Sequence, residues 1–203
     1  MSTDDKLLCS LDEKTIREIA NQAGVIEYLA YVVGLGRNRI TEGDILEIHD
    51  LTINGIYPCA GRFRDVTTKI VITDTTHQPS PPDRVKSDLR DMLEYLYGPG
   101  MENGPVHRSA FVMWKINAIH PFNGGNGRVA RAAAYLVIAL EVAPVFAGES
   151  MPTKLKRRKD EYVAGLKAAD AGNLMPLEEL VLECYSEQVG ELRQNSGTPS
   201  ANS

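Results

Sequence analysis

Residues 120–131 read His-Pro-Phe-Asn-Gly-Gly-Asn-Gly-Arg-Val-Ala-Arg and carry more reactive and anion-binding groups than any other stretch of this chain. His120 is the one group in the segment that can act as a base near neutral pH. The three glycines let backbone N–H groups approach an anion closely. Arg128 and Arg131 would share one helical face and could both bind phosphate oxygens. The segment therefore predicts a polyphosphate site beside a base.

A simpler interpretation is a helix–loop–helix corner, in which the glycines make the turn and the arginines are solvated. The stretch that follows the glycines is rich in Ala, Leu, Val and Ile. A helix beginning there would direct its unpaired N–H groups, at the positive end of its dipole, towards the loop. Because His120, Phe122 and Asn126 occur in fixed register with the two arginines, we favour the anion site over the plain corner.

The segment resembles the signature of Fic domains, His-x-Phe-x-(Asp/Glu)-Gly-Asn-Gly-Arg-x-x-Arg. The matching residues are His120, Phe122, Gly125, Asn126, Gly127, Arg128 and Arg131. Upstream, Gly61-Arg62-Phe63-Arg64 resembles the entry to the family's β-hairpin flap, and residues 66–73 resemble the flap. The likeness extends over roughly residues 12–190. It implies a mainly α fold, namely a Fic-like helical bundle with a short β-hairpin flap at about 61–78.

The resemblance also implies a reaction: transfer of AMP, or another nucleotide monophosphate, from a nucleoside triphosphate to a Ser, Thr or Tyr hydroxyl of a target protein. His120 would take the hydroxyl proton, and Phe122 would anchor the loop in the core. Asn126 and the neighbouring glycine backbone would bind the α-phosphate, and the two arginines the β and γ phosphates.

The full set expected at the nucleotide is Asn123, Gly124, Gly125, Asn126, Gly127, Arg128 and Arg131, and the set expected at the flap and the target is Thr67, Lys69, Ile70, Thr73 and His77. In this family the activity often belongs to a toxin or to the partner of a small antitoxin. The implied partners are therefore a target protein and an antitoxin or a second copy of the chain.

Gly124 departs from the signature, because the family carries Asp or Glu there to ligate Mg²⁺. Magnesium is usually held by one or two carboxylates together with phosphate and water. Asn123 could offer only a neutral amide oxygen, so we predict no protein metal ligand. Three interpretations stay open: phosphates and water alone hold Mg²⁺, the donor needs less help from a metal, or the chain binds ATP or another nucleotide without transferring it.

A second likeness concerns regulation. Many Fic domains carry an inhibitory helix with the pattern Ser/Thr-x-x-x-Glu-Gly/Asn, whose glutamate pairs with the second signature arginine. Residues 23–28, Ala-Gly-Val-Ile-Glu-Tyr, match in part and place Glu27 at the inhibitory position. Because the surrounding stretch is apolar, we expect Glu27 to be buried and to pair with Arg131. The alternative is an ordinary surface or capping residue.

Composition limits the remaining classes. A chain of 203 residues that is 43% hydrophobic can fill one core, so we expect a single domain over 1–193 and a disordered polar tail over 194–203. A net charge of −5 argues against nucleic-acid and membrane partners. The basic run 154–159 is interpreted as a solvated helix face, with a phosphate or nucleic-acid patch as the alternative. Three unpatterned cysteines and the absence of a signal-peptide core favour the cytoplasm.

The positioning elements are predicted to be helices. Apolar periodicity indicates helices at about 11–34, 42–52, 81–97, 106–119, 127–140, 152–169 and 176–193. Thr41 is the expected N-cap of the second helix, and the β-branched run 65–73 is the best strand candidate. His49 and His107 are expected to be helix-face or capping residues. The loop 120–131 would thus join two apolar helices.

Overall fold

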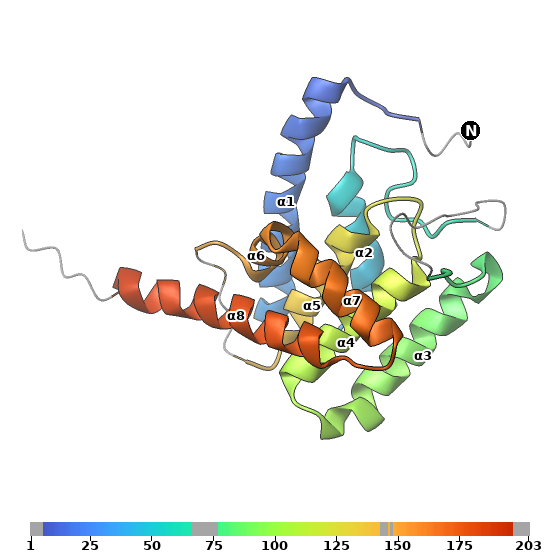
Figure 1. Cartoon of the computed structure of the whole chain (residues 1–203). Coiled ribbons are helices and arrows are strands. Elements are labelled where there is room, and N and C mark those ends of the chain that lie inside the picture. Colours follow the sequence, from blue (N-terminus) through green and yellow to red (C-terminus); the bar gives the residue numbers. More distant parts are fainter. Residues whose placement is uncertain (1–5, 66–76, 143–145, 147, 197–203) are drawn as a thin grey trace, which may run out of the picture.

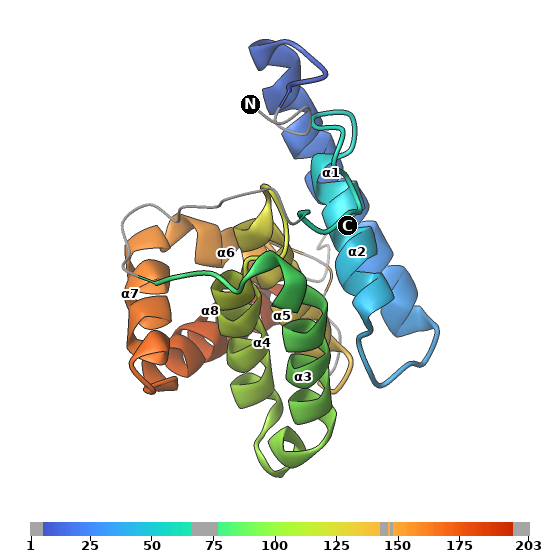
Figure 2. The same cartoon turned by 90° about the vertical axis from the view of Figure 1, so that its right-hand side faces the viewer.

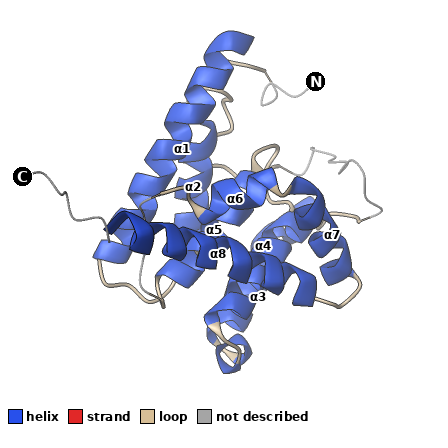
Figure 3. Ribbon diagram, turned by 60° about the vertical axis from the view of Figure 1, so that its left-hand side comes forward, coloured by secondary structure: helices blue, strands red, loops and turns tan. Residues whose placement is uncertain are grey.

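The computed structural model describes residues 6–65, 77–142, 146 and 148–196. Every regular element in these ranges is helical, and none of them is a strand (Figure 3). The α-helices are α1 Leu11–Gly34, α2 Glu42–Ile53, α3 Val85–Tyr97, α4 Pro105–Ile119, α5 Asn126–Ala139, α6 Met151–Arg157, α7 Lys159–Asp170 and α8 Met175–Ser196, with 3₁₀ turns at Pro82–Arg84 and Pro99–Glu102. The mainly α prediction is confirmed. The flap predicted at about 61–78 lies mostly outside the described residues.

The central element is α5, which the other helices surround in Figure 1. Eleven of its 14 residues are buried. A helix that is apolar almost all round is stable only inside a protein, and α5 is wrapped on several sides by α4, α2 and α6. Three consecutive alanines, Ala132–Ala134, are among its buried residues. The signature loop therefore leads directly into the core of the bundle.

Helices α1 and α2 lie side by side along one edge of the bundle, as Figure 2 shows. Both begin with a capping box: Ser10 with Glu13 in α1, and Thr41 with Asp44 in α2. In each box the hydroxyl and the carboxylate satisfy N–H groups that the first turn leaves unpaired. The prediction that Thr41 is an N-cap is confirmed.

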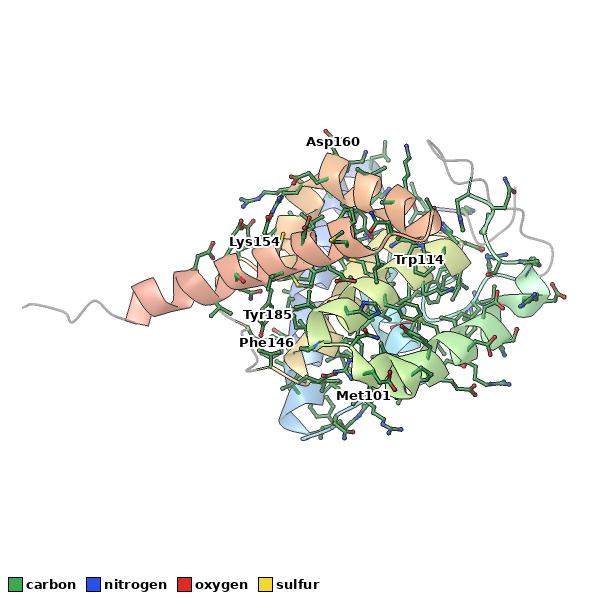
Figure 4. The ribbon with its side chains drawn as sticks, turned by 60° about the horizontal axis from the view of Figure 1, so that its bottom comes forward. Met101, Trp114, Phe146, Lys154, Asp160 and Tyr185 are labelled. Atoms are coloured by element: carbon green, nitrogen blue, oxygen red, sulfur yellow. The ribbon has the colours of Figure 1, made fainter. Side chains whose placement is uncertain are left out.

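The prediction of one helix over 152–169 is wrong, because the chain forms α6 and α7 with a break at Arg158 (φ −88°, ψ 44°). The solvated-face interpretation of the basic run also fails for Lys154, whose side chain is 3% exposed. Its ammonium lies beside α8 (Figure 4), where Glu191 accepts a hydrogen bond and Glu187 is 3.6 Å away. Carboxylates distant in sequence compensate a buried charge that the local pattern assigned to solvent.

The polar tail was predicted to begin at residue 194, but α8 continues to Ser196. Residues 197–203 lie outside the described part of the chain. Among the described helices, none combines the length and the apolar character that crossing a bilayer requires.

Candidate functional site

His120 ends α4 in the left-handed conformation, with φ 53°, the one positive φ of a non-glycine residue in the described ranges. Such strained backbone is concentrated at functional sites. The imidazole Nδ1 lies 3.3 Å from the Asn117 carbonyl oxygen, so Nδ1 carries the proton and Nε2 is the basic nitrogen. Burial, helped by the nearby charges of Arg64 and His77, lowers the pKa of His120. The ring is therefore a neutral base at neutral pH.

The guanidinium of Arg64 fixes the backbone that carries this base. Arg64 is buried, and its Nε donates to the His120 carbonyl at 2.7 Å. A second nitrogen donates to the Ile119 carbonyl at 3.3 Å, and the Arg64 backbone N–H donates to Pro121 at 2.9 Å. These carbonyls end α4, where a cation is favoured by the helix dipole. The sequence placed Arg64 only at the entry to the flap and did not predict this contact.

Phe122 is fully buried, as expected for the loop anchor. Its ring stacks on His49 at a centroid distance of 3.7 Å and on Phe63 at 5.6 Å. His49 was predicted to be a helix-face or capping residue, and this is wrong: it is fully buried. Its Nε2 is 3.1 Å from the Gly124 carbonyl oxygen, and burial lowers its pKa to about 4. The neutral ring therefore donates to the loop.

The Asn126 side chain closes the loop on itself. Its Oδ1 accepts from the Phe122 N–H at 3.0 Å, and its Nδ2 donates to the Phe122 carbonyl at 2.8 Å. The side-chain amide that was expected at the α-phosphate is thus engaged within the loop. No described group accepts from the backbone N–H of Asn126 or Gly127 at the start of α5. Two N–H groups at the positive end of a helix dipole are suited to bind an anion.

Gly125 shows why the loop tolerates no side chain at its turn. Its φ is +80°, and a Cβ there would lie 3.2 Å from Cγ2 of Ile53. Gly124 differs, because an added Cβ would have no neighbour within 4 Å. The backbone conformation therefore requires glycine at position 125. At position 124 an added Cβ would meet no neighbour.

The two signature arginines differ in their surroundings. Arg128 is 35% exposed and forms an ion pair with Glu18 of α1 at 3.3 Å. Arg131 has no described carboxylate within ion-pair distance, and its guanidinium lies over the Tyr162 ring, 5.5 Å from the centroid. Burial lowers the pKa of Arg131. A half-buried cation without a counter-ion is suited to bind an anionic ligand.

The expectation that Glu27 is buried and paired with Arg131 is wrong, because Glu27 is exposed on α1. The helix is amphipathic, and its buried positions Val25, Leu29 and Val32 define a face that excludes Glu27. The α1 carboxylate that meets a signature arginine is Glu18. An inhibitory role for Glu27 stays a prediction.

Of the residues predicted to face the target, only His77 is described. Its Nε2 is 2.9 Å from the Ala118 carbonyl oxygen, and its Nδ1 is 3.5 Å from Asp170. It therefore lies at the end of α4, near His120. Thr67, Lys69, Ile70 and Thr73 lie outside the described residues.

The surroundings of Gly124 do not fit a protein-ligated magnesium ion. A cavity of about 250 Å³ at this position is lined by Asn123, Gly124, Gly125, Ile53, Tyr57, Cys59 and Arg128. None of these is a carboxylate. Asn123 Oδ1 is buried without a partner and is a neutral oxygen. Across the described residues, no three His, Cys, Asp or Glu side chains are grouped as a metal site. Magnesium prefers charged oxygen ligands.

Comparison with known proteins gives a consistent result. Residues 39–138 match the model of the Fic/DOC family. Protein adenylyltransferase fic-1 of Caenorhabditis elegans is 30% identical over 169 residues, which cover 80% of this chain and 31% of that protein. The protein of the same name from Caenorhabditis briggsae is 29% identical over 195 residues, covering 91% and 36%. The chain thus spans about a third of the length of these relatives.

The fold is similar as well. A solved structure of part of Fic-1 from C. elegans superposes with a TM-score of 0.71 at 26% identity, covering 96% of this chain and 56% of that one. A Fic family protein from Desulfovibrio desulfuricans superposes with a TM-score of 0.69 at 23% identity, covering 93% and 56%.

Proposed function

Since the chain belongs to the Fic/DOC family, we propose that it is a protein adenylyltransferase, which transfers AMP from ATP to a Ser, Thr or Tyr hydroxyl of a target protein. The observation that carries the proposal is the adjacency of the neutral His120 ring to two backbone N–H groups that are suited to bind an anion. His120 ends one helix, and the free N–H groups of Asn126 and Gly127 begin the next. Arg131, which pairs with no carboxylate that the structure describes, lies further along α5.

The proposed step balances as a simple displacement. The target hydroxyl gives its proton to Nε2 of His120 while its oxygen attacks the α-phosphorus of ATP. The bond from the α-phosphorus to the bridging oxygen breaks, and pyrophosphate leaves. The N–H groups at the start of α5 stabilise the charge on the α-phosphate. Arg128 and Arg131 hold the outgoing phosphates.

A second candidate is a nucleotide-binding module that transfers slowly or not at all. The observation that favours it is the lack of a carboxylate around Gly124. The intact base favours the enzyme, because binding alone does not need His120. The two candidates share the anion site and differ in whether the α-phosphorus is attacked.

The test is intact-mass spectrometry of the full chain after incubation with each of the four nucleoside triphosphates and Mg²⁺, for the wild type and His120→Ala. We expect the wild type to gain the mass of one nucleotide monophosphate on its own hydroxyls, or on an added target. His120→Ala should lose this activity by about 10²–10⁴-fold, the usual contribution of a general base. Binding of ATP with no mass gain in the wild type would favour the binding module.

Gly124→Asp sharpens this test. An added Cβ would meet no described atom within 4 Å, so we expect a change in the free energy of unfolding within about 0.5 kcal/mol. If the missing carboxylate limits the wild type, the variant should modify targets at least about tenfold faster, and only with Mg²⁺ present. Gly124→Asn, of similar size and without charge, is the matched control. Equal rates for both variants would exclude a limiting role for the carboxylate.

A further inference from the structure

A third cation lies at the cavity that Arg128 and Arg131 share. This cavity, about 80 Å³, is bounded by α1, α2, α5 and α6, and Lys156 of α6 is among its lining residues. Lys156 comes from the basic run that the sequence assigned to a solvated helix face. The two helices across the opening are tied together, since Gln22 Nε2 of α1 donates to Thr153 Oγ1 of α6 at 2.7 Å. Lys156 therefore lines the same cavity as the two signature arginines.

Three other cations of the basic run, Lys154, Arg157 and Arg158, are paired with carboxylates. Lys154 contacts three glutamates, Arg157 pairs with Glu149 at 2.6 Å, and Arg158 pairs with Glu161 and Glu183. Lys156 has no carboxylate partner among the described residues and is exposed. Lys159 is also exposed and pairs with no carboxylate in the described part of the chain, but it does not line the cavity.

The charge around the cavity is unbalanced. Three cations, Arg128, Arg131 and Lys156, line it together with one carboxylate, that of Glu18. Glu18 pairs with Arg128 at 3.3 Å, and no carboxylate of the described residues pairs with Arg131 or Lys156. Like charges in a confined site raise the free energy of the empty site, and an entering anion lowers it. The cavity is therefore built for a ligand that carries more than one negative charge.

The size of the cavity limits which part of a ligand it can hold. Pockets that enclose a whole small-molecule ligand measure about 300–1,000 Å³, and this one is much smaller. It can take the end of a nucleotide and not its base and sugar. Of the parts of a nucleoside triphosphate, the terminal phosphate has the smallest volume and the highest charge.

We propose that Lys156 binds the terminal phosphate of the donor, together with Arg131, and so makes the site prefer a nucleoside triphosphate over a nucleotide with fewer phosphates. The inference rests on the proposed function, because it assumes that the donor is a nucleotide bound at the signature loop. Lys156 lies outside the signature, so the third cation is a feature of this chain's own α6.

The experiment is isothermal titration calorimetry of the full chain with ATP, AMP and inorganic tripolyphosphate at low ionic strength. The variants are Lys156→Gln, the matched control Lys159→Gln, and Arg131→Ala. Lys156→Gln should weaken ATP and tripolyphosphate binding about fivefold, the effect of one partly exposed charge. It should leave AMP binding unchanged, and Lys159→Gln should match the wild type for all three ligands.

The possible results distinguish failure of the inference about Lys156 from failure of the proposed function. If Lys156→Gln and Lys159→Gln behave alike, or if AMP binding falls as much as ATP binding, the terminal-phosphate role is overturned while the proposed function stands. If the wild type binds neither ATP nor tripolyphosphate, the proposed function fails and takes this inference with it. If ATP binds and Arg131→Ala has no effect, the phosphates lie elsewhere and the inference fails alone.

Discussion

The two sides of the signature loop are built in opposite ways. On the inner side, His49, Phe122 and Asn126 are buried, and their rings and polar atoms hold the loop. On the outer side, towards α1 and α6, Arg128 and Lys156 are at least partly exposed, and a single weak ion pair links Arg128 to Glu18. The inner residues contact other parts of the protein, whereas the outer cations are accessible to a charged ligand.

This difference indicates how the site divides its tasks. The position of the base and of the first N–H groups of α5 is set during folding, at a cost that packing offsets. The charge of a ligand would be neutralised by the partly exposed side chains of the outer side, which can change conformation. We therefore expect inner substitutions to change stability and outer substitutions to change affinity.

The largest expected effect is on the inner side. Phe122→Ala should lower the free energy of unfolding by about 3–5 kcal/mol, because a fully buried ring is removed and its stacked neighbours cannot fill the space. Urea unfolding followed by circular dichroism measures this. Leu182→Ala, at a side chain 51% exposed on α8, is the control and should change stability by less than about 1 kcal/mol. Similar losses in both variants would contradict a rigid inner side.

The sequence predicted the inner side only in part. Phe122 was assigned as an anchor because the signature places an apolar residue next to the base. His49 and Arg64 were missed as supports, since each lies more than 50 residues from the loop atoms it bonds. Histidine on a helix and arginine before a flap have many uses, and only the tertiary structure brings these two to the loop.

The second expected effect is a pH dependence from His49. Its pKa is about 4 in the folded chain, against 6.5 when unfolded. Between these pH values the unfolded chain binds more protons than the folded chain. The contribution of His49 to the free energy of unfolding is therefore fully present above pH 6.5 and falls as the pH drops towards 4. We expect His49 to account for a loss of about 2 kcal/mol between pH 7 and pH 5.

His49→Gln is the variant that isolates this contribution, because glutamine keeps a donor for the Gly124 carbonyl and does not titrate. Urea unfolding at pH 7, 6 and 5 should give a shallower decline for this variant than for the wild type. His120, whose pKa is also lowered, contributes with the same sign in both proteins. Parallel declines would show that His49 is not held neutral by the fold.

The smallest expected effect is on the outer side. Glu18→Gln removes the carboxylate that competes for Arg128, and the pair is exposed enough that stability should change by less than about 1 kcal/mol. Tripolyphosphate should bind about twofold more tightly, as titration calorimetry would measure. Glu27→Gln is the matched control on the same helix and should change neither quantity. A larger gain from Glu27→Gln would instead support the inhibitory role predicted for Glu27.

The outer side illustrates why local sequence is a poor guide to charge. The run 154–159 reads as one basic face, yet the structure divides it: Lys154 is buried among carboxylates, Arg158 breaks the helix, and Lys156 lines the cavity. Apart from the break between α6 and α7, the helices were predicted well, because apolar periodicity is a local property. Which cation meets which carboxylate depends on how α6 and α8 pack, and periodicity carries no information on that.

The open space at Gly124 has an evolutionary consequence. Every glycine codon becomes an aspartate or a glutamate codon by one G-to-A transition at its second position. A Cβ at this position would meet no described atom within 4 Å, so the first atom of the new side chain displaces no neighbour. A single nucleotide change therefore separates the form of this site without a carboxylate from the form with one. A lineage could change from either form to the other with no intermediate sequence between them.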